Sequence, residues 1–200
     1  MVVVQSRPNP VARIGAVASV LMQTLLLVQP GPALAFDPED LTRLRATLQC
    51  ESCDLTAANL VDADLRAANM ARSDLSQAQL TRAILLGADL RGADLSGANL
   101  RGANLFHARL EGATLSRADL TGANLAGASL RGVVAEQGIW RGADLFEADL
   151  RAALLTDTAT AGADLSRADL TGAALAGTDL GRARLCATLL PDGRRDDSGC

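Results

Sequence analysis

Residues 92–105 read GADLSGANLRGANL, a stretch in which leucine returns at every fifth residue. Ala lies two positions before each of these leucines, and Asp or Asn lies directly before them. The same pattern extends over residues 51–190, where leucine occupies almost every residue number that is divisible by five. An α-helix repeats about every 3.6 residues and a β-strand about every 2, so a five-residue period belongs to neither alone. Fixed-period self-similarity instead predicts a solenoid, whose units bury their apolar side by stacking on their neighbours.

The repeated unit resembles that of the pentapeptide-repeat family, whose pattern is A-[DN]-L-x-x, and residues 92–105 match it position for position. The resemblance covers about 140 of the 200 residues. It implies an all-β fold, a right-handed quadrilateral parallel β-helix with four pentapeptides in each coil and about seven coils. At about 4.8 Å between stacked strands, such a rod would be roughly 34 Å long.

One patch, residues 131–140, interrupts the leucines without changing the register. Ala135 and Trp140 occupy two of the leucine positions, and Thr160 would lie one coil above Trp140 in a four-sided coil. Two undersized side chains thus flank an oversized one, and close-packed interiors tolerate exchanges that conserve total volume. We therefore expect Trp140 to be a buried core residue.

Residues 1–35 have the features of a signal peptide. Arg7 and Arg13 give a positively charged start, residues 14–28 are apolar, and residues 33–35 read Ala-Leu-Ala, the small-x-small pattern of a cleavage site. The apolar run is short for a membrane span, although a retained membrane anchor is the alternative. Because no two arginines are adjacent, the pattern favours the Sec route over the twin-arginine route. We expect export to the periplasm or, in a cyanobacterium, to the thylakoid lumen.

Residues 36–50 are predicted to form a capping helix at the N-terminal end of the β-helix. Asp37 can accept hydrogen bonds from the first-turn amides, and Pro38 suits the first helical position. Three leucines at spacings of three and four would share one face: Leu41, Leu44 and Leu48. An open β-helix end exposes interior leucines and unpaired strand groups, so we expect this helix to cover that end.

The four cysteines lie at the two ends of the repeat block, with Cys50 and Cys53 at its start and Cys186 and Cys200 at the far end. An even number of cysteines behind a signal peptide favours disulfides. A disulfide needs Cα atoms within about 7 Å, and the ends of the implied rod are too far apart for that. The expected pairs are therefore Cys50–Cys53 and Cys186–Cys200. The second pair would tether residues 191–200 as a C-terminal tail and stabilise the protein by about 3 kcal/mol.

Cys50 and Cys53 also form a C-x-x-C motif, so the alternative is thiol–disulfide exchange through this pair. That motif indicates redox chemistry next to a βαβ pattern, which the sequence does not contain. The Asp and Asn residues before each leucine are assigned to hydrogen bonds at the corners rather than to metal binding. His107, the only histidine, has no second ligand or nucleophile at a matching spacing. We expect no catalytic, cofactor or metal site, and so no enzyme activity.

One line of outward positions is apolar. The residue directly after the central leucine on one side of the coil is large and apolar in three coils: Leu86, Phe106 and Phe146. Scattered apolar surface residues are common, but a contiguous patch on a protein surface tends to mark an interface. These three residues are the candidate interface, either with a partner protein or with a second copy of the chain.

The chain is acidic, with a formal net charge of −4, which becomes −6 once Arg7 and Arg13 are removed. An acidic chain without a basic stripe is not expected to bind nucleic acid, and no membrane contact is expected after signal cleavage. The segments around the cysteines resemble secreted pentapeptide-repeat proteins common in cyanobacteria. The resemblance favours a non-catalytic exported binding or scaffold module.

A different branch of the same family provides the alternative function. Some pentapeptide-repeat proteins are acidic rods that imitate DNA and bind DNA gyrase. The negative charge of this chain permits that reading. Against it stand the predicted signal peptide, the cysteine pairs and exposed arginines that would interrupt a DNA-like surface: Arg66, Arg91, Arg101, Arg131, Arg141 and Arg151.

Overall fold

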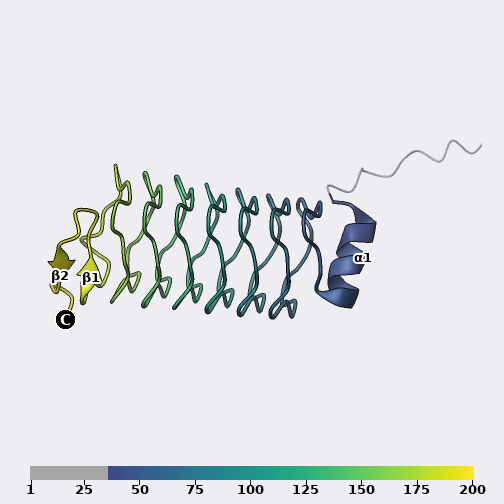
Figure 1. Ribbon diagram of the computed structural model, residues 1–200, viewed down its shortest axis with the longest axis horizontal. Coiled ribbons are helices and arrows are strands. Elements are labelled where there is room, and N and C mark those ends of the chain that lie inside the picture. Colours follow the sequence, from purple (N-terminus) through teal and green to yellow (C-terminus); the bar gives the residue numbers. More distant parts are fainter. Residues whose placement is uncertain (1–35) are drawn as a thin grey trace, which may run out of the picture. The chain divides into compact units, whose positions relative to one another are not determined.

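The computed structural model describes residues 36–200, and the predicted signal peptide of residues 1–35 lies outside the described residues. Residues 36–200 form a stack of similar coils (Figure 1). Helix α1 (Pro38–Thr47) lies at one end of the stack, and two short strands, β1 (Thr188–Leu189) and β2 (Arg195–Asp196), lie at the other. Within this part of the chain, no helix combines the length and the apolar character that a membrane crossing requires.

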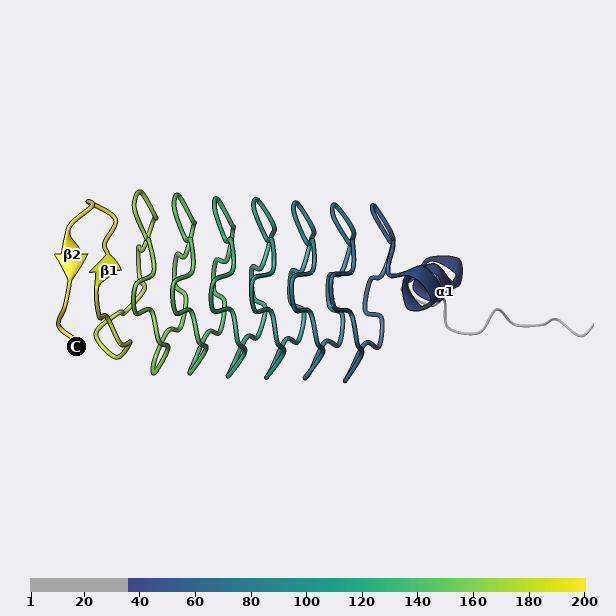
Figure 2. The same ribbon diagram turned by 60° about the horizontal axis from the view of Figure 1, so that its bottom comes forward.

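The coils are held together by parallel β-bridges between residues twenty positions apart. The first bridge joins Gln49 to Asn69 and the last joins Asp169 to Leu189. A register of twenty residues corresponds to four pentapeptides in each coil, as the sequence predicts. Figure 2 shows the coils edge-on, each stacked directly on the previous one.

A single repeat shows why each position has its residue type. Leu95 and Ala98 are completely buried, and the Ala98 amide donates to the Leu95 carbonyl at 3.0 Å, which closes the corner. The Asp94 carboxylate accepts a hydrogen bond from the amide of Ser96 at 2.8 Å. Gly97 has a φ of 65°, in the left-handed region where glycine is favoured. The Asp and Asn residues of the repeat therefore cap corners by local hydrogen bonds, as expected.

The irregular patch is accommodated inside the core. Trp140 is only 1 % exposed, which confirms that it is a buried core residue, and its neighbours Ala135 and Thr160 are buried as well. Gly138 lies where most repeats have Ala. A Cβ atom on Gly138 would lie 2.9 Å from Trp140 Nε1 and 3.1 Å from the Ala135 carbonyl oxygen. The indole thus occupies the space that a small side chain fills elsewhere.

Four repeats carry Ser or Thr at the small position, and each hydroxyl donates to a backbone carbonyl. The acceptor is always the residue 23 positions earlier, which lies in the preceding coil. The pairs are Ser73 with Cys50 (2.5 Å), Thr158 with Ala135 (2.8 Å), Thr178 with Leu155, and Thr188 with Leu165 (2.8 Å). Because a buried hydroxyl is costly without a partner, this shared acceptor explains why the repeat admits them.

Helix α1 begins as predicted but ends earlier than predicted. The Asp37 carboxylate accepts from the amide of Glu39 at 2.8 Å, and Leu41 and Leu44 are buried in the core. The expectation that Leu48 shares their helical face is wrong. Leu48 follows the helix in a left-handed conformation with a φ of 57°, and its amide donates to the Leu44 carbonyl. This reversal ends the helix and directs the chain into the first coil.

The predicted repeat block, which ends at residue 190, and the predicted disulfide-tethered tail, residues 191–200, meet in a hairpin. Strand β1, inside the predicted repeat block, pairs antiparallel with β2 in the tail, so the boundary falls within a hairpin. The Gly199 amide donates to the Leu185 carbonyl at 2.8 Å, and Leu185 is buried. Leu175 and Leu180 lie on the other sides of the last coil and are only partly buried. The tail thus covers part of this end, because no further coil follows.

Candidate interaction surface

The three apolar side chains of the candidate interface lie at one corner of the coils. Their exposed fractions are 41 % for Leu86, 37 % for Phe106 and 37 % for Phe146. The Gly87 amide donates to the Phe106 carbonyl at 2.9 Å, which places Leu86 and Phe106 in adjacent coils. Ala126 lies between the two phenylalanines and is 8 % exposed. We call this line of residues the apolar corner; its role as an interface stays a prediction.

Polar side chains frame both aromatic rings of the apolar corner. The His107 ring meets the Phe106 ring edge-on, with 4.0 Å between centroids. The Arg167 guanidinium lies 5.5 Å from the centroid of the Phe146 ring and is within 2.7 Å of the Glu147 carboxylate. A cation over an aromatic face is attractive, so Arg167 helps to hold the Phe146 ring in place. Each of the two rings therefore has a polar side chain beside it, although both rings are exposed.

The structure pairs the cysteines as the sequence predicts. The sulfur atoms of Cys50 and Cys53 are 2.02 Å apart, and Cys186 and Cys200 are the second close pair, with 4.7 Å between Cα atoms. The oxidised state of both pairs in the cell stays a prediction. Cys50 is fully buried and Cys53 is 2 % exposed, with Arg43 Nη2 at 2.8 Å from the Cys53 sulfur. Thiol–disulfide exchange needs an accessible thiolate, so this burial does not fit the redox alternative.

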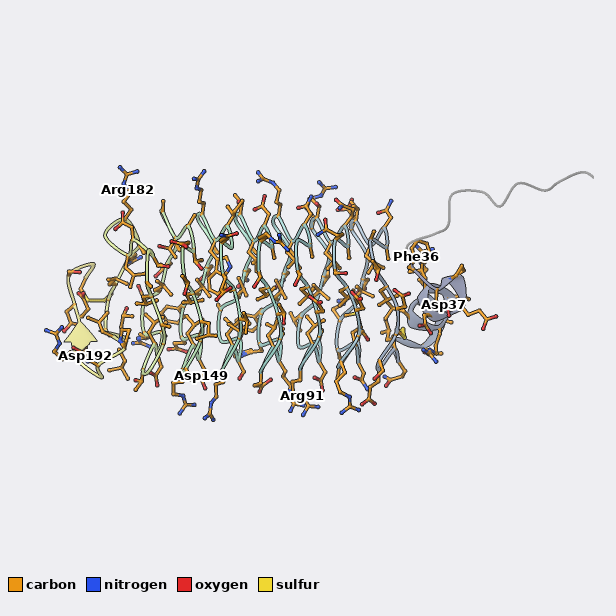
Figure 3. The ribbon with its side chains drawn as sticks, turned by 90° about the horizontal axis from the view of Figure 1, so that it is seen from above. Phe36, Asp37, Arg91, Asp149, Arg182 and Asp192 are labelled. Atoms are coloured by element: carbon orange, nitrogen blue, oxygen red, sulfur yellow. A yellow bond between two sulfur atoms is a disulfide. The ribbon has the colours of Figure 1, made fainter. Side chains whose placement is uncertain are left out.

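Aspartates and arginines pair along the surface of the coils. In Figure 3, Arg91 and Asp149 lie on the same long side of the stack. Arg91 donates to both carboxylate oxygens of Asp89, at 2.8 and 2.5 Å. The Arg91 guanidinium and the Arg91 amide hold the pKa of Asp89 below its ordinary value, and Arg151 does the same for Asp149. Four of the arginines singled out in the sequence are paired in this way: Arg66, Arg91, Arg101 and Arg151.

These ion pairs predict a pH dependence of stability. Because the folded pKa values of Asp89 and Asp149 lie below the unfolded ones, their stabilising contribution is complete above about pH 4. It is lost as the pH falls through the folded pKa values. Since exposed pairs contribute little, we expect a loss of about 0.2–1 kcal/mol for each pair. Thermal unfolding between pH 6 and pH 2 would measure it.

Asp89→Asn with Asp149→Asn provides the matched control for this pH effect. Asparagine keeps the oxygen that caps each corner, as it does elsewhere in the repeat, but it does not titrate. The unfolding midpoint of the double variant should therefore fall less steeply with pH than that of the parent protein. Equal slopes would assign the acid sensitivity to other carboxylates.

The described part of the chain was searched for clusters of metal-ligating side chains and for surface depressions. Among residues 36–200, no three His, Cys, Asp or Glu side chains converge in a way that could hold a metal ion. A shallow depression of about 260 Å³ lies near the C-terminal end, where the last coil departs from the regular bridges. Its lining includes Arg141, Thr158, Thr160 and Asp179.

Three further exposed apolar residues were not singled out in the sequence: Val61, Ile139 and Leu154. Val61 is 40 % exposed and lies directly after the central residue Leu60. Ile139 is 37 % exposed and Leu154 is 41 % exposed, and each lies directly before a central position. That position usually holds Asp or Asn, so an apolar residue there could have revealed the exposure from the sequence alone. They lie on different sides of the coil from the apolar corner, because the repeat places them in other columns of the twenty-residue register.

Comparison with known proteins identifies the repeat. The family model for Pentapeptide repeats matches in eight copies, over residues 49–85, 58–97, 98–134, 123–158 and 143–185. HetL, a protein involved in heterocyst differentiation regulation from the cyanobacterium Nostoc sp. strain PCC 7120, is 33 % identical. The match covers 74 % of each chain, with a TM-score of 0.38. The Nostoc protein alr5209 is 44 % identical over 40 % of this chain and 66 % of its own, with a TM-score of 0.40.

A more distant likeness bears on the fold alone. QnrB1, a plasmid-mediated fluoroquinolone resistance protein, is 19 % identical over 76 % of this chain and 85 % of its own, with a TM-score of 0.51. No functionally curated protein matches this chain. The repeat and the likeness to QnrB1 together give the fold as a right-handed quadrilateral β-helix. The chain belongs to the pentapeptide repeat family.

Proposed function

We propose that the protein is an exported, non-catalytic protein-binding module whose binding surface is the apolar corner. Its rod would have about seven coils, with α1 as the cap of its N-terminal end. The observation that carries the proposal is the exposure of Leu86, Phe106 and Phe146 at a single corner. The repeat admits polar residues at this position, so the fold does not require large apolar side chains there. A contiguous apolar patch on a rigid surface is typical of protein interfaces.

Exchanging both aromatic rings for charge tests this proposal. Phe106→Arg with Phe146→Arg should reduce capture of the partner by at least tenfold. The unfolding midpoint should stay nearly unchanged, because both side chains are exposed and lie outside the core. The measurement is cross-linking in the native host from a photoreactive residue placed at position 86. The matched control is Val61→Arg with Leu154→Arg, since these residues are 40 % and 41 % exposed but lie elsewhere on the coil.

The control variant should keep the cross-link at full yield. If the Phe106 and Phe146 variant cross-links as well as the parent, the apolar corner is not the binding surface. If both variants lose the cross-link, the effect comes from general surface charge rather than from this corner. Either result would overturn the proposal in its present form.

The export part of the proposal is supported by the predicted signal peptide and by the two cysteine pairs. An intact mass of the protein from its native host, prepared without reductant, tests both. We expect a chain that begins at Phe36 and is lighter by the four hydrogens of two disulfides. A full-length mass with four free thiols would refute export and would favour the gyrase-binding alternative. The paired arginines of the surface speak against that alternative, because they interrupt an acidic, DNA-like surface.

A further inference from the structure

We propose that the occupant of the apolar corner is the same corner of a second copy of the chain, running antiparallel. The two-fold axis would pass between the coil of Phe106 and the coil of Ala126. This inference rests on the proposed function, because it uses the same surface and names its partner. The partner is identified by the order of large and small side chains along the corner.

The residues that directly follow the central leucines on this side of the coils form a column. In the proposed register, the columns of the two copies are complementary to each other. Along the corner each column reads Leu86, Phe106, Ala126 and Phe146, at intervals of one coil. The proposed axis places each Phe106 ring over the Ala126 of the other copy, and each Leu86 against the other Phe146. Every large ring then meets a smaller side chain, which is how packed interfaces achieve complementarity. A contact that repeats itself under a two-fold axis also closes into a dimer rather than a fibre.

The next column along the corner obeys the same rule. Under the same axis, Glu147 faces Gly87, and Arg167 faces Ala67. The space over Gly87 is open, since a Cβ atom there would have no neighbour within 4 Å. His107 does not need room on the partner, because its Nδ1 lies 3.1 Å from the carbonyl oxygen of Gly127 in its own chain. The long side chains of this column therefore do not oppose one another.

Other registers are less complementary when both columns are considered. An axis through the coil of Phe106 places the two Phe106 rings directly against each other. An axis through the coil of Ala126 places Phe106 against Phe146 and Ala126 against its own copy. The facing rings would then keep the two chains too far apart for the alanines to touch. A parallel dimer places every large side chain against its own copy.

An axis between Ala126 and Phe146 also pairs large with small in this column, with Phe106 facing Ser166, but it places His107 against Arg167 in the next column. An axis between Leu86 and Phe106 places Phe146 at the level of α1, beyond the coils. The axis between Phe106 and Ala126 is therefore the one that fits both columns.

Charge and size predict a weak, reversible dimer. Asp64 would face Asp164, but each is already paired with an arginine of its own chain, Arg66 at 2.5 Å and Arg184 at 3.5 Å. The apolar corner is a narrow ridge about 14 Å long, three coil intervals at about 4.8 Å each. It buries much less than the roughly 800 Å² per partner of a standard interface. We therefore expect a dissociation constant in the micromolar range.

Exchanging the residues at positions 106 and 126, the ring and the small residue that it faces, tests the register. Sedimentation equilibrium of the protein purified from its native host should show a dimer at about 200 µM, well above a micromolar dissociation constant. Ala126→Phe fills the recess and should weaken the dimer at least tenfold. Phe106→Ala removes the ring and should weaken it similarly. The double variant Phe106→Ala with Ala126→Phe should dimerise again, because the same axis exchanges these two positions.

Ala71→Phe is the matched control, since Ala71 holds the equivalent corner position on another side and is 6 % exposed. It should leave the dimer unchanged. If Ala126→Phe strengthens association, the corner acts as a general apolar patch and the register is wrong. If the double variant stays monomeric, or if the parent protein is monomeric at about 200 µM, the inference is overturned.

Spin labels on single added cysteines give the geometry directly. A label at position 64 should lie about 24 Å along the rod from its copy, or five coils at about 4.8 Å. A label at position 104 should be offset by only one coil, about 5 Å. A parallel dimer would give equal separations at both positions, and an axis through Ala126 would lengthen the first to about 29 Å. Either result would replace the proposed arrangement.

The failure of this inference can be told apart from the failure of the proposed function. A monomeric protein whose apolar corner cross-links to a different protein in the host supports the proposed function and refutes the self-pairing. A dimer that shows the expected label distances, with no cross-link to another protein, supports the self-pairing and refutes binding of a different partner through this corner.

Discussion

Replacing Trp140 with alanine should lower the free energy of unfolding by about 3–5 kcal/mol, the range for large aromatic side chains in cores. Trp140 is 1 % exposed, and the central positions beside it hold the small residues Ala135 and Thr160. These neighbours cannot extend to fill the space that the indole leaves, so the cavity should persist. Denaturant unfolding followed by circular dichroism measures the loss.

A double-mutant cycle of Gly138 and Trp140 shows whether the Trp140 indole is what excludes a side chain at position 138. Gly138→Ala in the parent protein should cost about 1–3 kcal/mol, because the added methyl group overpacks the core beside Trp140 Nε1 and the Ala135 carbonyl. Trp140→Leu restores the usual repeat leucine, and in that background Gly138→Ala should cost much less. The carbonyl at 3.1 Å stays in both backgrounds. Equal costs in the two backgrounds would assign the glycine to the backbone rather than to the indole.

Detaching helix α1 from the end of the coils should cause the protein to associate into large assemblies. Leu41→Asp with Leu44→Asp would place two charges where the parent side chains are 8 % and 0 % exposed. Since burying an unpaired charge is very costly, we expect α1 to leave the end of the coils. The first coil would then present interior leucines and unpaired strand groups, which favour association end to end. Light scattering after size-exclusion chromatography should show large assemblies.

Ala46→Asp is the control for the cap, because Ala46 is an exposed residue of the same helix. It adds the same kind of charge without burying it, and the variant should elute like the parent protein. If the double variant also elutes unchanged and keeps its unfolding midpoint, α1 is not needed to close this end.

The fold was predictable because each position of the repeat serves one purpose in every coil. Leu95 fills the interior, Ala98 fits beside the turning backbone, and Asp94 caps the corner. Such a pattern repeats the same local physics many times, so a single sequence carries it without ambiguity. The helix start was predictable for a similar reason, since Asp37 and Pro38 act through neighbouring residues.

The features that escaped prediction depend on contacts between coils or on the absence of a next coil. The hydroxyl of Thr158 is satisfied by a carbonyl 23 residues earlier, a partner that no local pattern reveals. The hairpin of β1 and β2 forms because the repeat ends and the last strand groups need other partners. For the apolar corner, the sequence located Leu86, Phe106 and Phe146 in one column, but it did not reveal that His107 and Arg167 lie beside the two rings.

The register of twenty residues has a consequence for how such a chain can change in length. Inserting or deleting a whole coil would leave every downstream residue on its original side, so surface columns would simply grow or shorten. Adding or removing one pentapeptide would instead turn everything after it by a quarter of the circumference. Phe146 would then leave the column of Phe106 and face a neighbouring direction. The surface of this protein can therefore be lengthened only in steps of twenty residues and redirected in steps of five.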